Sequence, residues 1–235
     1  MTVWWITLFS TYFLCLFARM SGKYKYLKGE RVFRANALFA GMACAVLIFV
    51  SGFRQGIGDT GTYRDLFEKV PASFFGFLTH PTIKTDSGFY AIVAFIKQCI
   101  SSDSQKVLLC MAIVTIGLIF ITYYKNTDMI EIAVFLFITS GCYLVTMNGV
   151  RQYLASAILF FCFPMIYKRQ WKFYLPIVLL CSTIHQSALI FLLLYFVVDQ
   201  PAWGNTTKGI LFICDLSSYR SIIGKSIRRN AIWKL

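Results

Sequence analysis

The residues best suited to chemistry in this sequence lie at positions 148–152, which read Asn-Gly-Val-Arg-Gln. A permanent cation, Arg151, stands there beside two amide side chains, Asn148 and Gln152, at the start of a hydrophobic stretch. Three- and four-residue spacings place Asn148, Gln152 and Ser156 on one face of a helix. The arginine fork suits phosphate oxygens, because it is planar and keeps its charge. The pattern predicts a helix whose small polar stripe faces other helices or a wet cavity in lipid.

A second polar segment, residues 54–65, follows an apolar run and contains Arg54, Asp59, Thr60 and Tyr63. Its glycines formally match G-x-G-x-x-G, but the segment does not follow a strand that opens a βαβ unit, so the match does not predict a dinucleotide site. Glycines do allow close backbone approach and exposed N–H groups, which suit an anionic ligand. A flexible interfacial loop is the alternative that stays open.

His185 is the third candidate, because a titratable side chain inside an apolar run is a functional hypothesis by default. Its alternative is a structural histidine whose ring is hydrogen-bonded to Ser182 and a neighbouring helix. Arg151 has an alternative too, since an arginine at a helix end can snorkel to the interface. Three further charges are interpreted as solvated loop charges: Asp86, Lys97 and Asp103.

The composition shows what kind of protein must position these residues. The chain has 235 residues, of which 58% are hydrophobic and 14% charged, which is too apolar for a soluble domain. The charges cluster between long uncharged runs, so a multi-spanning protein of the lipid bilayer is predicted. The net charge of +13 does not indicate nucleic-acid binding, because no basic stripe interleaves with exposed aromatics.

The eight cysteines do not form a recognisable site. No Cys-x-x-Cys pair occurs, so neither a zinc site nor a disulfide framework is predicted. Most of them read as small packing residues inside apolar runs: Cys15, Cys44, Cys110, Cys142, Cys162 and Cys181. No metal site is predicted. The first apolar run, residues 3–18, lacks the basic n-region of a signal peptide and is interpreted as a first span.

The apolar runs predict an all-α, polytopic fold with about six transmembrane helices and one re-entrant or interfacial helix. The last run is longer than the hydrocarbon slab and should tilt or break near residues 182–187. The short run at 88–100, interrupted by Lys97, is the re-entrant or interfacial candidate, and the alternative that it crosses stays open. Residues 1–200 form the predicted membrane domain and 201–235 a basic tail. The predicted spans are 3–18, 35–53, 107–124, 130–147, 153–167 and 173–198.

Charge placement predicts the topology. Residues 19–34 hold six cations against the single Glu30, so the positive-inside rule places this segment in the cytoplasm, together with the cationic residues 168–172. Residues 54–86 then form a mixed-charge loop outside the membrane. Under this topology the three polar segments converge on the outer side.

These residues, in their order, resemble the EpsG/Wzy-like family of bacterial exopolysaccharide, capsule and O-antigen polymerases. The resemblance covers roughly residues 35–198 and consists of an arginine before Gly-x-Asp-Thr-x-x-Tyr, then Asn-x-x-Arg-Gln-x-x-Ala-x-Ala, then His-x-Ser-Ala. The matching residues are Arg54, Gly58, Asp59, Thr60 and Tyr63; Asn148, Arg151, Gln152, Ala155 and Ala157; and His185, Ser187 and Ala188.

The resemblance implies a membrane glycosyltransferase that polymerises undecaprenyl-diphosphate-linked repeat units at the outer face of the bacterial cytoplasmic (inner) membrane. It implies no nucleotide-sugar donor and no dissociable organic cofactor. Arg54 and Arg151 would hold the diphosphate, and either Asp59 or His185 would take the acceptor proton. The other residues expected at the substrate are Thr60, Tyr63, Asn148 and Gln152.

Two other functions stay open, namely transport of lipid-linked glycans and a non-catalytic role among other polysaccharide assembly proteins. A transporter would use the same cations without needing a base. Family members usually continue with further spans, whereas this sequence continues from Trp203 as a basic tail, which indicates a shortened chain.

Overall fold

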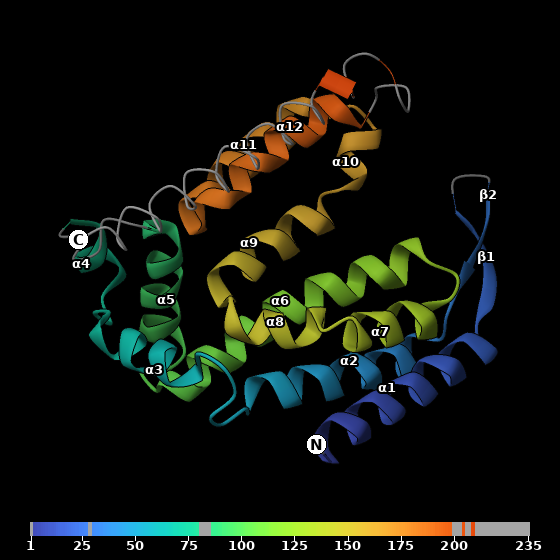
Figure 1. The fold of residues 1–235 in the computed structure, drawn as a ribbon, viewed down its shortest axis with the longest axis horizontal. Coiled ribbons are helices and arrows are strands. Elements are labelled where there is room, and N and C mark those ends of the chain that lie inside the picture. Colours follow the sequence, from blue (N-terminus) through green and yellow to red (C-terminus); the bar gives the residue numbers. More distant parts are fainter. Residues whose placement is uncertain (1, 28–29, 80–85, 199–203, 205–207, 210–235) are drawn as a thin grey trace, which may run out of the picture. The chain divides into compact units, whose positions relative to one another are not determined.

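The computed structural model describes residues 2–27, 30–79, 86–198, 204 and 208–209 (Figure 1). The chain divides into two compact units, residues 1–189 and 190–235. In the second unit, helix α12 covers Ile190–Val197. Most of the predicted basic tail, 201–235, lies outside the described residues.

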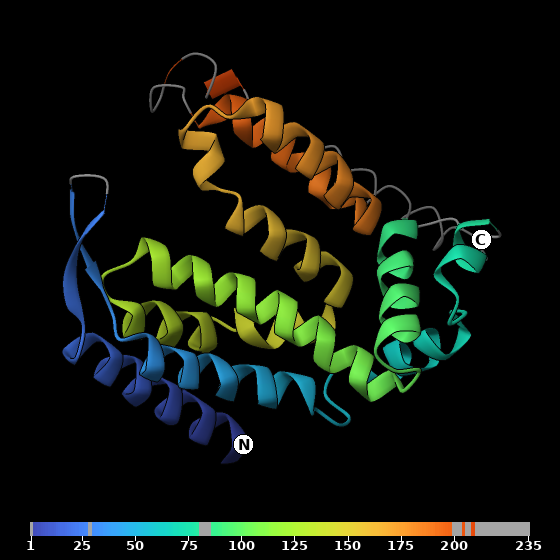
Figure 2. The same cartoon turned by 180° about the vertical axis from the view of Figure 1, so that it is seen from behind.

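The first unit is almost entirely helical, with helices gathered around α6 (Figures 1 and 2). Its helices are α1 (Thr2–Met20), α2 (Ala37–Gly52), α3 (Thr60–Lys69), α4 (Phe74–Thr79), α5 (Ser87–Cys99), α6 (Ser104–Asn126), α7 (Ile130–Thr139), α8 (Cys142–Asn148), α9 (Val150–Phe161), α10 (Pro164–Tyr167), α11 (Trp171–Ile184) and the short 3-10 helix η1 (Gln186–Leu189).

Helix α6 is the centre of this unit because it packs against α2, α3, α5, α7 and α9. Its 23 residues correspond to about 34 Å at 1.5 Å per residue. The Asp103 carboxylate caps its first turn by accepting a hydrogen bond from the Gln105 backbone N–H at 3.0 Å. Asp103 is exposed, as the sequence predicted, and the structure adds that it caps this helix.

The core beside α6 is built from small and aliphatic residues of α1, α2 and α7, which let these helices approach closely. Two polar contacts join helices here, one between α8 and α2 and one between α1 and α7. The Tyr143 hydroxyl donates to the Leu47 carbonyl at 2.6 Å, and Arg19 Nη1 donates to Glu131 Oε1 at 2.5 Å. The Glu131 side chain is 3% exposed and that of Arg19 is 39% exposed, so this partly buried ion pair joins α1 to α7.

Residues 23–27 and 30–34 correct the all-α prediction, because they form two antiparallel paired strands, β1 (Lys23–Leu27) and β2 (Glu30–Arg34), called the hairpin below. The register pairs Lys23 with Arg34 and Leu27 with Glu30. Charged and aromatic residues alternate along β1, which is the period of a strand. The excess of cations predicted that this segment lies between two spans, but it did not predict the secondary structure of the segment.

The outer loop predicted at 54–86 is also partly helical. Helix α3 buries Thr60, Tyr63 and Phe67, whose three- and four-residue spacing makes one face of a helix. Lys97 of α5 donates to the Phe67 carbonyl at 2.9 Å and to the Val70 carbonyl at 2.6 Å. Lys97 therefore holds the C-terminal end of α3, and its interpretation as a solvated charge was wrong.

The predicted count of about six spans is not confirmed by the residues that the structure describes. Within the described residues, three helical segments are long and apolar enough to cross a membrane: 2–20, 104–126 and 150–167. A fourth candidate is the pair α7 and α8, bent by 56°. The bend follows Gly141, whose φ of 81° leaves the helical region and interrupts the predicted span 130–147. The run 173–198 breaks at His185, so the predicted break is confirmed.

Helix α5 has 13 residues and a length of about 20 Å, shorter than a hydrocarbon slab of about 30 Å. This length fits the prediction of a re-entrant or interfacial helix. In Figure 2, α5 lies by the N-terminal end of α6.

The two ends of α6 differ in chemistry. At its C-terminal end Arg34 of the hairpin donates to the Lys125 carbonyl at 2.8 Å, and Lys168 lines a cavity with Asn126. At its N-terminal end Gln105 donates to the Gly52 carbonyl at 2.5 Å, next to the polar segment 54–65. Arg34 and Lys168 of the two basic segments thus lie at one end of α6 and the polar segment 54–65 at the other, while the side of the membrane that each end faces stays a prediction.

Candidate functional site

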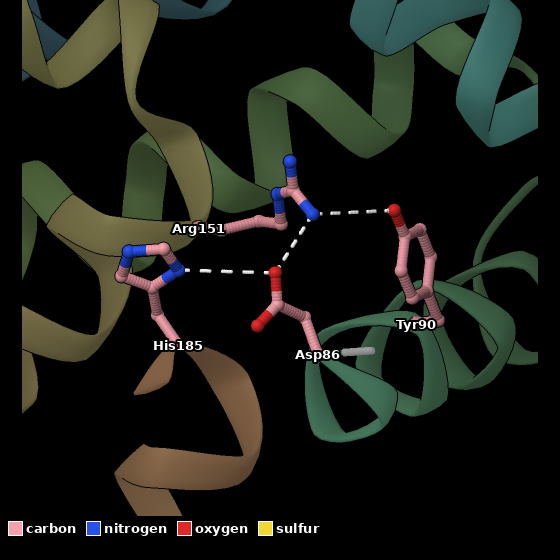
Figure 3. A network of polar contacts seen from close by, with 4 residues as sticks. All are labelled: Asp86, Tyr90, Arg151 and His185. Carbon is pink, nitrogen blue, oxygen red and sulfur yellow. Dashed lines mark hydrogen bonds and ion pairs between the residues drawn. The ribbon is translucent and has the colours of Figure 1, made fainter. Parts of the chain in front are cut away.

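Four side chains from three parts of the sequence, Asp86 and Tyr90, Arg151, and His185, form one network of polar contacts (Figure 3). Arg151 Nη1 donates to Asp86 Oδ2 at 2.8 Å and lies 3.5 Å from the Tyr90 hydroxyl. His185 Nδ1 lies 3.8 Å from the same Asp86 oxygen. One carboxylate oxygen is therefore shared between a permanent cation and an imidazole.

Arg151 lies in the first turn of α9, directly after a break in the chain. Helix α8 ends at Asn148, and Gly149 has a φ of −98° and a ψ of 54°, which are not helical. The continuous polar stripe predicted from Asn148 to Ser156 was therefore wrong. A helix N-terminus carries partial positive charge and disfavours a cation, so Asp86 offsets an unfavourable position of Arg151.

His185 is placed by the end of α11. Its backbone is extended, with φ −155° and ψ 126°, and its N–H donates to the Cys181 carbonyl at 2.9 Å. The Ser182 hydroxyl donates to the Leu179 carbonyl at 2.7 Å and not to the imidazole. Nδ1 of His185 is buried without a hydrogen-bond partner among the described residues. Figure 3 shows the other ring nitrogen, Nε2, directed away from Asp86.

Asp86 and Tyr90 are the site residues that sequence reasoning missed. The Asp86 side chain is only 12% exposed and is paired, so its interpretation as a solvated loop charge was wrong. Tyr90, one helical turn later on α5, is 2% exposed, and burial raises the pKa of its hydroxyl. The available signal was the spacing itself, since an Asp at a helix start and a Tyr four residues later lie on one face.

Tyr63 joins this cluster from α3. It is 8% exposed, its ring packs at 6.4 Å from that of Phe89, and its hydroxyl interacts with the Arg151 guanidinium. Two tyrosine hydroxyls and one carboxylate thus surround one arginine. Because the Arg151 side chain is still 32% exposed, it also reaches the protein surface.

Arg54 has a different environment from Arg151. It is 5% exposed, and its three guanidinium nitrogens donate to Thr60 Oγ1 at 3.1 Å, the Ser51 carbonyl at 2.7 Å and the Met147 carbonyl at 3.2 Å. Burial lowers the pKa of this guanidinium. The cavity beside it measures about 10 Å³, the size of roughly one water molecule. Substrate binding by Arg54 stays a prediction, and its contacts indicate a positioning role.

The remaining predicted residues divide into buried and exposed ones. Thr60 is 1% exposed and its hydroxyl donates to the Ile57 carbonyl at 2.5 Å. Asn148 lies against Gly58, and its side-chain oxygen has no partner among the described residues. Asp59 and Gln152 are both exposed and are not drawn into the Asp86 cluster. In the part of the chain that the structure describes, no three metal-ligating side chains come together.

Gly58 explains how tightly the segment 54–60 is held against α8. Its φ is 54°, and a Cβ atom there would lie 1.5 Å from Asn148 Oδ1. Gly56 has a φ of 67°, but a Cβ atom on it would meet nothing within 4 Å. Both glycines therefore have a positive φ, which disfavours other residues, but only Gly58 also lacks space for a side chain.

Gly58→Ala should destabilise the protein by about 1–3 kcal/mol more than Gly56→Ala, because only the former adds an overlap to the left-handed backbone cost. Thermal unfolding of both detergent-purified variants measures the difference. Adding Asn148→Ala to Gly58→Ala should restore part of the loss. Equal stability of the two single variants would contradict the packing of Gly58 against Asn148.

Of the comparisons with known proteins, the one with protein-family models gives a match. A family model described as the EpsG family matches residues 37–220, a range that contains every residue of the site described above. No curated protein and no solved structure matches the chain.

Proposed function

Because the chain belongs to the EpsG family, and is thus a membrane protein related to polysaccharide biosynthesis, we propose that it polymerises lipid-diphosphate-linked oligosaccharide repeat units at the outer face of the bacterial cytoplasmic membrane. The observation that carries this proposal is the contact of Arg151 and His185 with the same Asp86 oxygen. A cation for a diphosphate and a histidine for a hydroxyl proton are the two groups that glycosyl transfer from such a donor needs.

Arg151 is the group proposed to bind the diphosphate. Its fork matches phosphate oxygens, and the start of α9 adds the partial positive charge of a helix N-terminus. The negative charge on the leaving diphosphate grows as the glycosidic bond breaks, so a cation held at this place stabilises the transition state. In the absence of substrate, the Asp86 carboxylate is paired with the Arg151 guanidinium. The diphosphate competes with Asp86 for this guanidinium.

His185 is the proposed base, and Asp86 positions it. His185 Nδ1 lies 3.8 Å from Asp86 Oδ2 and lacks a hydrogen-bond partner among the described residues. When the diphosphate displaces Asp86 from Arg151, the Asp86 carboxylate becomes available to accept a hydrogen bond from His185 Nδ1–H. A carboxylate on Nδ1–H leaves Nε2 as the proton acceptor. Nε2 takes the proton of the acceptor hydroxyl, the hydroxyl oxygen bonds to the anomeric carbon, and the lipid diphosphate leaves with the electron pair of the broken bond.

The other residues have supporting roles in this proposal. Arg54, Thr60 and Asn148 hold the segment 54–60 on the ends of α2 and α8. Tyr63 and Tyr90 hold the Arg151 guanidinium from the sides of α3 and α5. Gln152 is exposed beside Arg151 and is assigned to the sugar, while Asp59, exposed at the start of α3, is the second candidate for the base.

A transporter of lipid-linked glycans is the second candidate function. The discontinuous helices α7–α8 and α11–η1 favour it, because transporters commonly bind substrate where helices are broken. A transporter would use Arg151 to bind the diphosphate and would have no use for a base.

Purified full-length protein in liposomes, supplied with lipid-linked repeat units, separates the candidates. The proposal predicts longer glycans on one lipid, resolved by gel electrophoresis of the released chains. If the substrate is moved across the bilayer but its glycan is not extended, the protein is a transporter and the polymerase proposal is wrong. Substrate that is neither moved nor extended would leave a non-catalytic subunit of a polysaccharide assembly complex as the function.

A further inference from the structure

A cavity of about 480 Å³ lies at the base of the β-hairpin, at the opposite end of α6 from the candidate site. Its volume is within the range of about 300–1,000 Å³ that small-molecule sites have. It is formed where the hairpin meets the ends of three helices. The lining residues are Ser21, Lys23, Arg34, Ala35, Asn36, Ala37 and Tyr124.

The charge of this cavity is unbalanced. Lys23 and Arg34 lie directly opposite each other in the hairpin register, an arrangement of like charges that destabilises a strand pair. Among the described residues that line the cavity, none is acidic. Arg34 is fixed by donating to the Tyr124 carbonyl at 3.3 Å and the Lys125 carbonyl at 2.8 Å, and Lys23 is exposed. An anion in the cavity would relieve this repulsion.

The surroundings of the cavity indicate that the anion belongs to a lipid. The hairpin base is bound to helix ends, since the Asn36 N–H donates to the Ala18 carbonyl at 2.7 Å and the Tyr124 hydroxyl to the Ala35 carbonyl at 2.8 Å. Helices α1 and α6 are both candidate spans, so their ends reach headgroup level. Tyr24 and Tyr26 on the hairpin are 60% and 79% exposed, and tyrosine is enriched at membrane interfaces.

We propose that this cavity binds the headgroup phosphate of an anionic phospholipid, with Lys23 and Arg34 as its cationic partners. The excess of cations on this segment assigns it to the cytoplasmic leaflet, whose anionic lipids attract juxtamembrane lysine and arginine. The site fixes the hairpin on the membrane surface and is independent of the polymerase proposal, because it lies at the other end of α6.

Native mass spectrometry of the full chain in detergent tests the proposal with phosphatidylglycerol and phosphatidylcholine of identical acyl chains. Wild-type protein should retain phosphatidylglycerol in preference to phosphatidylcholine, and Lys23→Glu should lower that preference by at least about fivefold, because it replaces a cation with an anion. Lys106→Glu is the matched control, since Lys106 is exposed in the first turn of α6, far from the cavity. The control should retain the wild-type preference.

The same experiment distinguishes a lipid from a free anion. Millimolar inorganic phosphate or glycerol phosphate should leave phosphatidylglycerol bound, because the interfacial tyrosines and helix ends keep the lipid in place. Displacement by either anion would mean that the cavity takes soluble phosphate and would overturn the lipid assignment. Unchanged lipid preference in Lys23→Glu, or an equal loss in Lys106→Glu, would overturn the site itself.

Discussion

Arg151→Lys should reduce polymer yield by about tenfold to a hundredfold while the protein still accumulates in the membrane. Lysine keeps the charge and can still meet Asp86, but it loses the planar fork that binds two phosphate oxygens at once. Hydrogen bonds to charged groups contribute about 1.5–3 kcal/mol each, which corresponds to this range of rates. Polymer yield per amount of purified protein in liposomes is the measurement.

Arg19→Lys is the matched control for this prediction. Arg19 is also an arginine paired with a carboxylate at a helix end, but its partner is Glu131 and it lies on α1, away from the site. This variant should keep its yield within about twofold, since an ammonium group replaces the guanidinium in a simple ion pair. If Arg151→Lys performed as well as Arg19→Lys, the guanidinium of Arg151 would only balance Asp86 and would not bind diphosphate.

His185→Gln should lower turnover by about a hundredfold to ten-thousandfold, the range that a positioned general base contributes. Binding of the lipid diphosphate should change little, because Arg151 and α9 are intact.

Asp86→Asn should also lower turnover, but it should lower KM at the same time, since the carboxylate no longer competes with substrate for Arg151. Initial rates over a range of lipid-linked donor concentrations separate kcat from KM for both variants.

Two aspartates provide the controls. Asp59→Asn tests the second candidate base, and in the proposed mechanism it should retain most turnover, because Asp59 is exposed and outside the Asp86 cluster. Asp103→Asn changes another aspartate at a helix start, where asparagine caps equally well, and should be neutral. Loss of turnover in Asp59→Asn with full activity in His185→Gln would transfer the role of base to Asp59. Loss of protein accumulation in His185→Gln would indicate a structural histidine.

The sequence by itself determined the class of protein and most of the polar residues at issue. Long uncharged runs and sparse charge are sufficient for a polytopic helical protein, because a bilayer demands apolar side chains and internally satisfied backbones. The order and spacing of the motifs around Arg54, Arg151 and His185 were sufficient to predict the family, and the match to the family model confirms this prediction. The break at His185 was also readable, since the apolar run is too long for the slab.

The sequence did not determine local geometry within these runs. Gly141 and Gly149 interrupt predicted helices because their backbone angles leave the helical region, a choice that glycine permits but does not require. The basic residues 23–27 and 30–34 form paired strands, which the sequence did not predict, since cation content constrains the side of the membrane and not the backbone. Helix lengths and the number of spans follow from such local choices.

Only the tertiary structure decided which charged residues are partners. Asp86, Lys97 and Asp103 look alike in the sequence, as charges between apolar runs, yet one joins Arg151, one holds α3 and one caps α6. Likewise, Arg54 and Arg151 belong to equally polar segments, but the packing of α2, α3 and α8 buries the first and leaves the second at the surface. The cap at Asp103 is a local contact, but the contacts of Lys97, Asp86 and Arg54 join residues 30, 65 and 93 positions apart, and no local pattern encodes them.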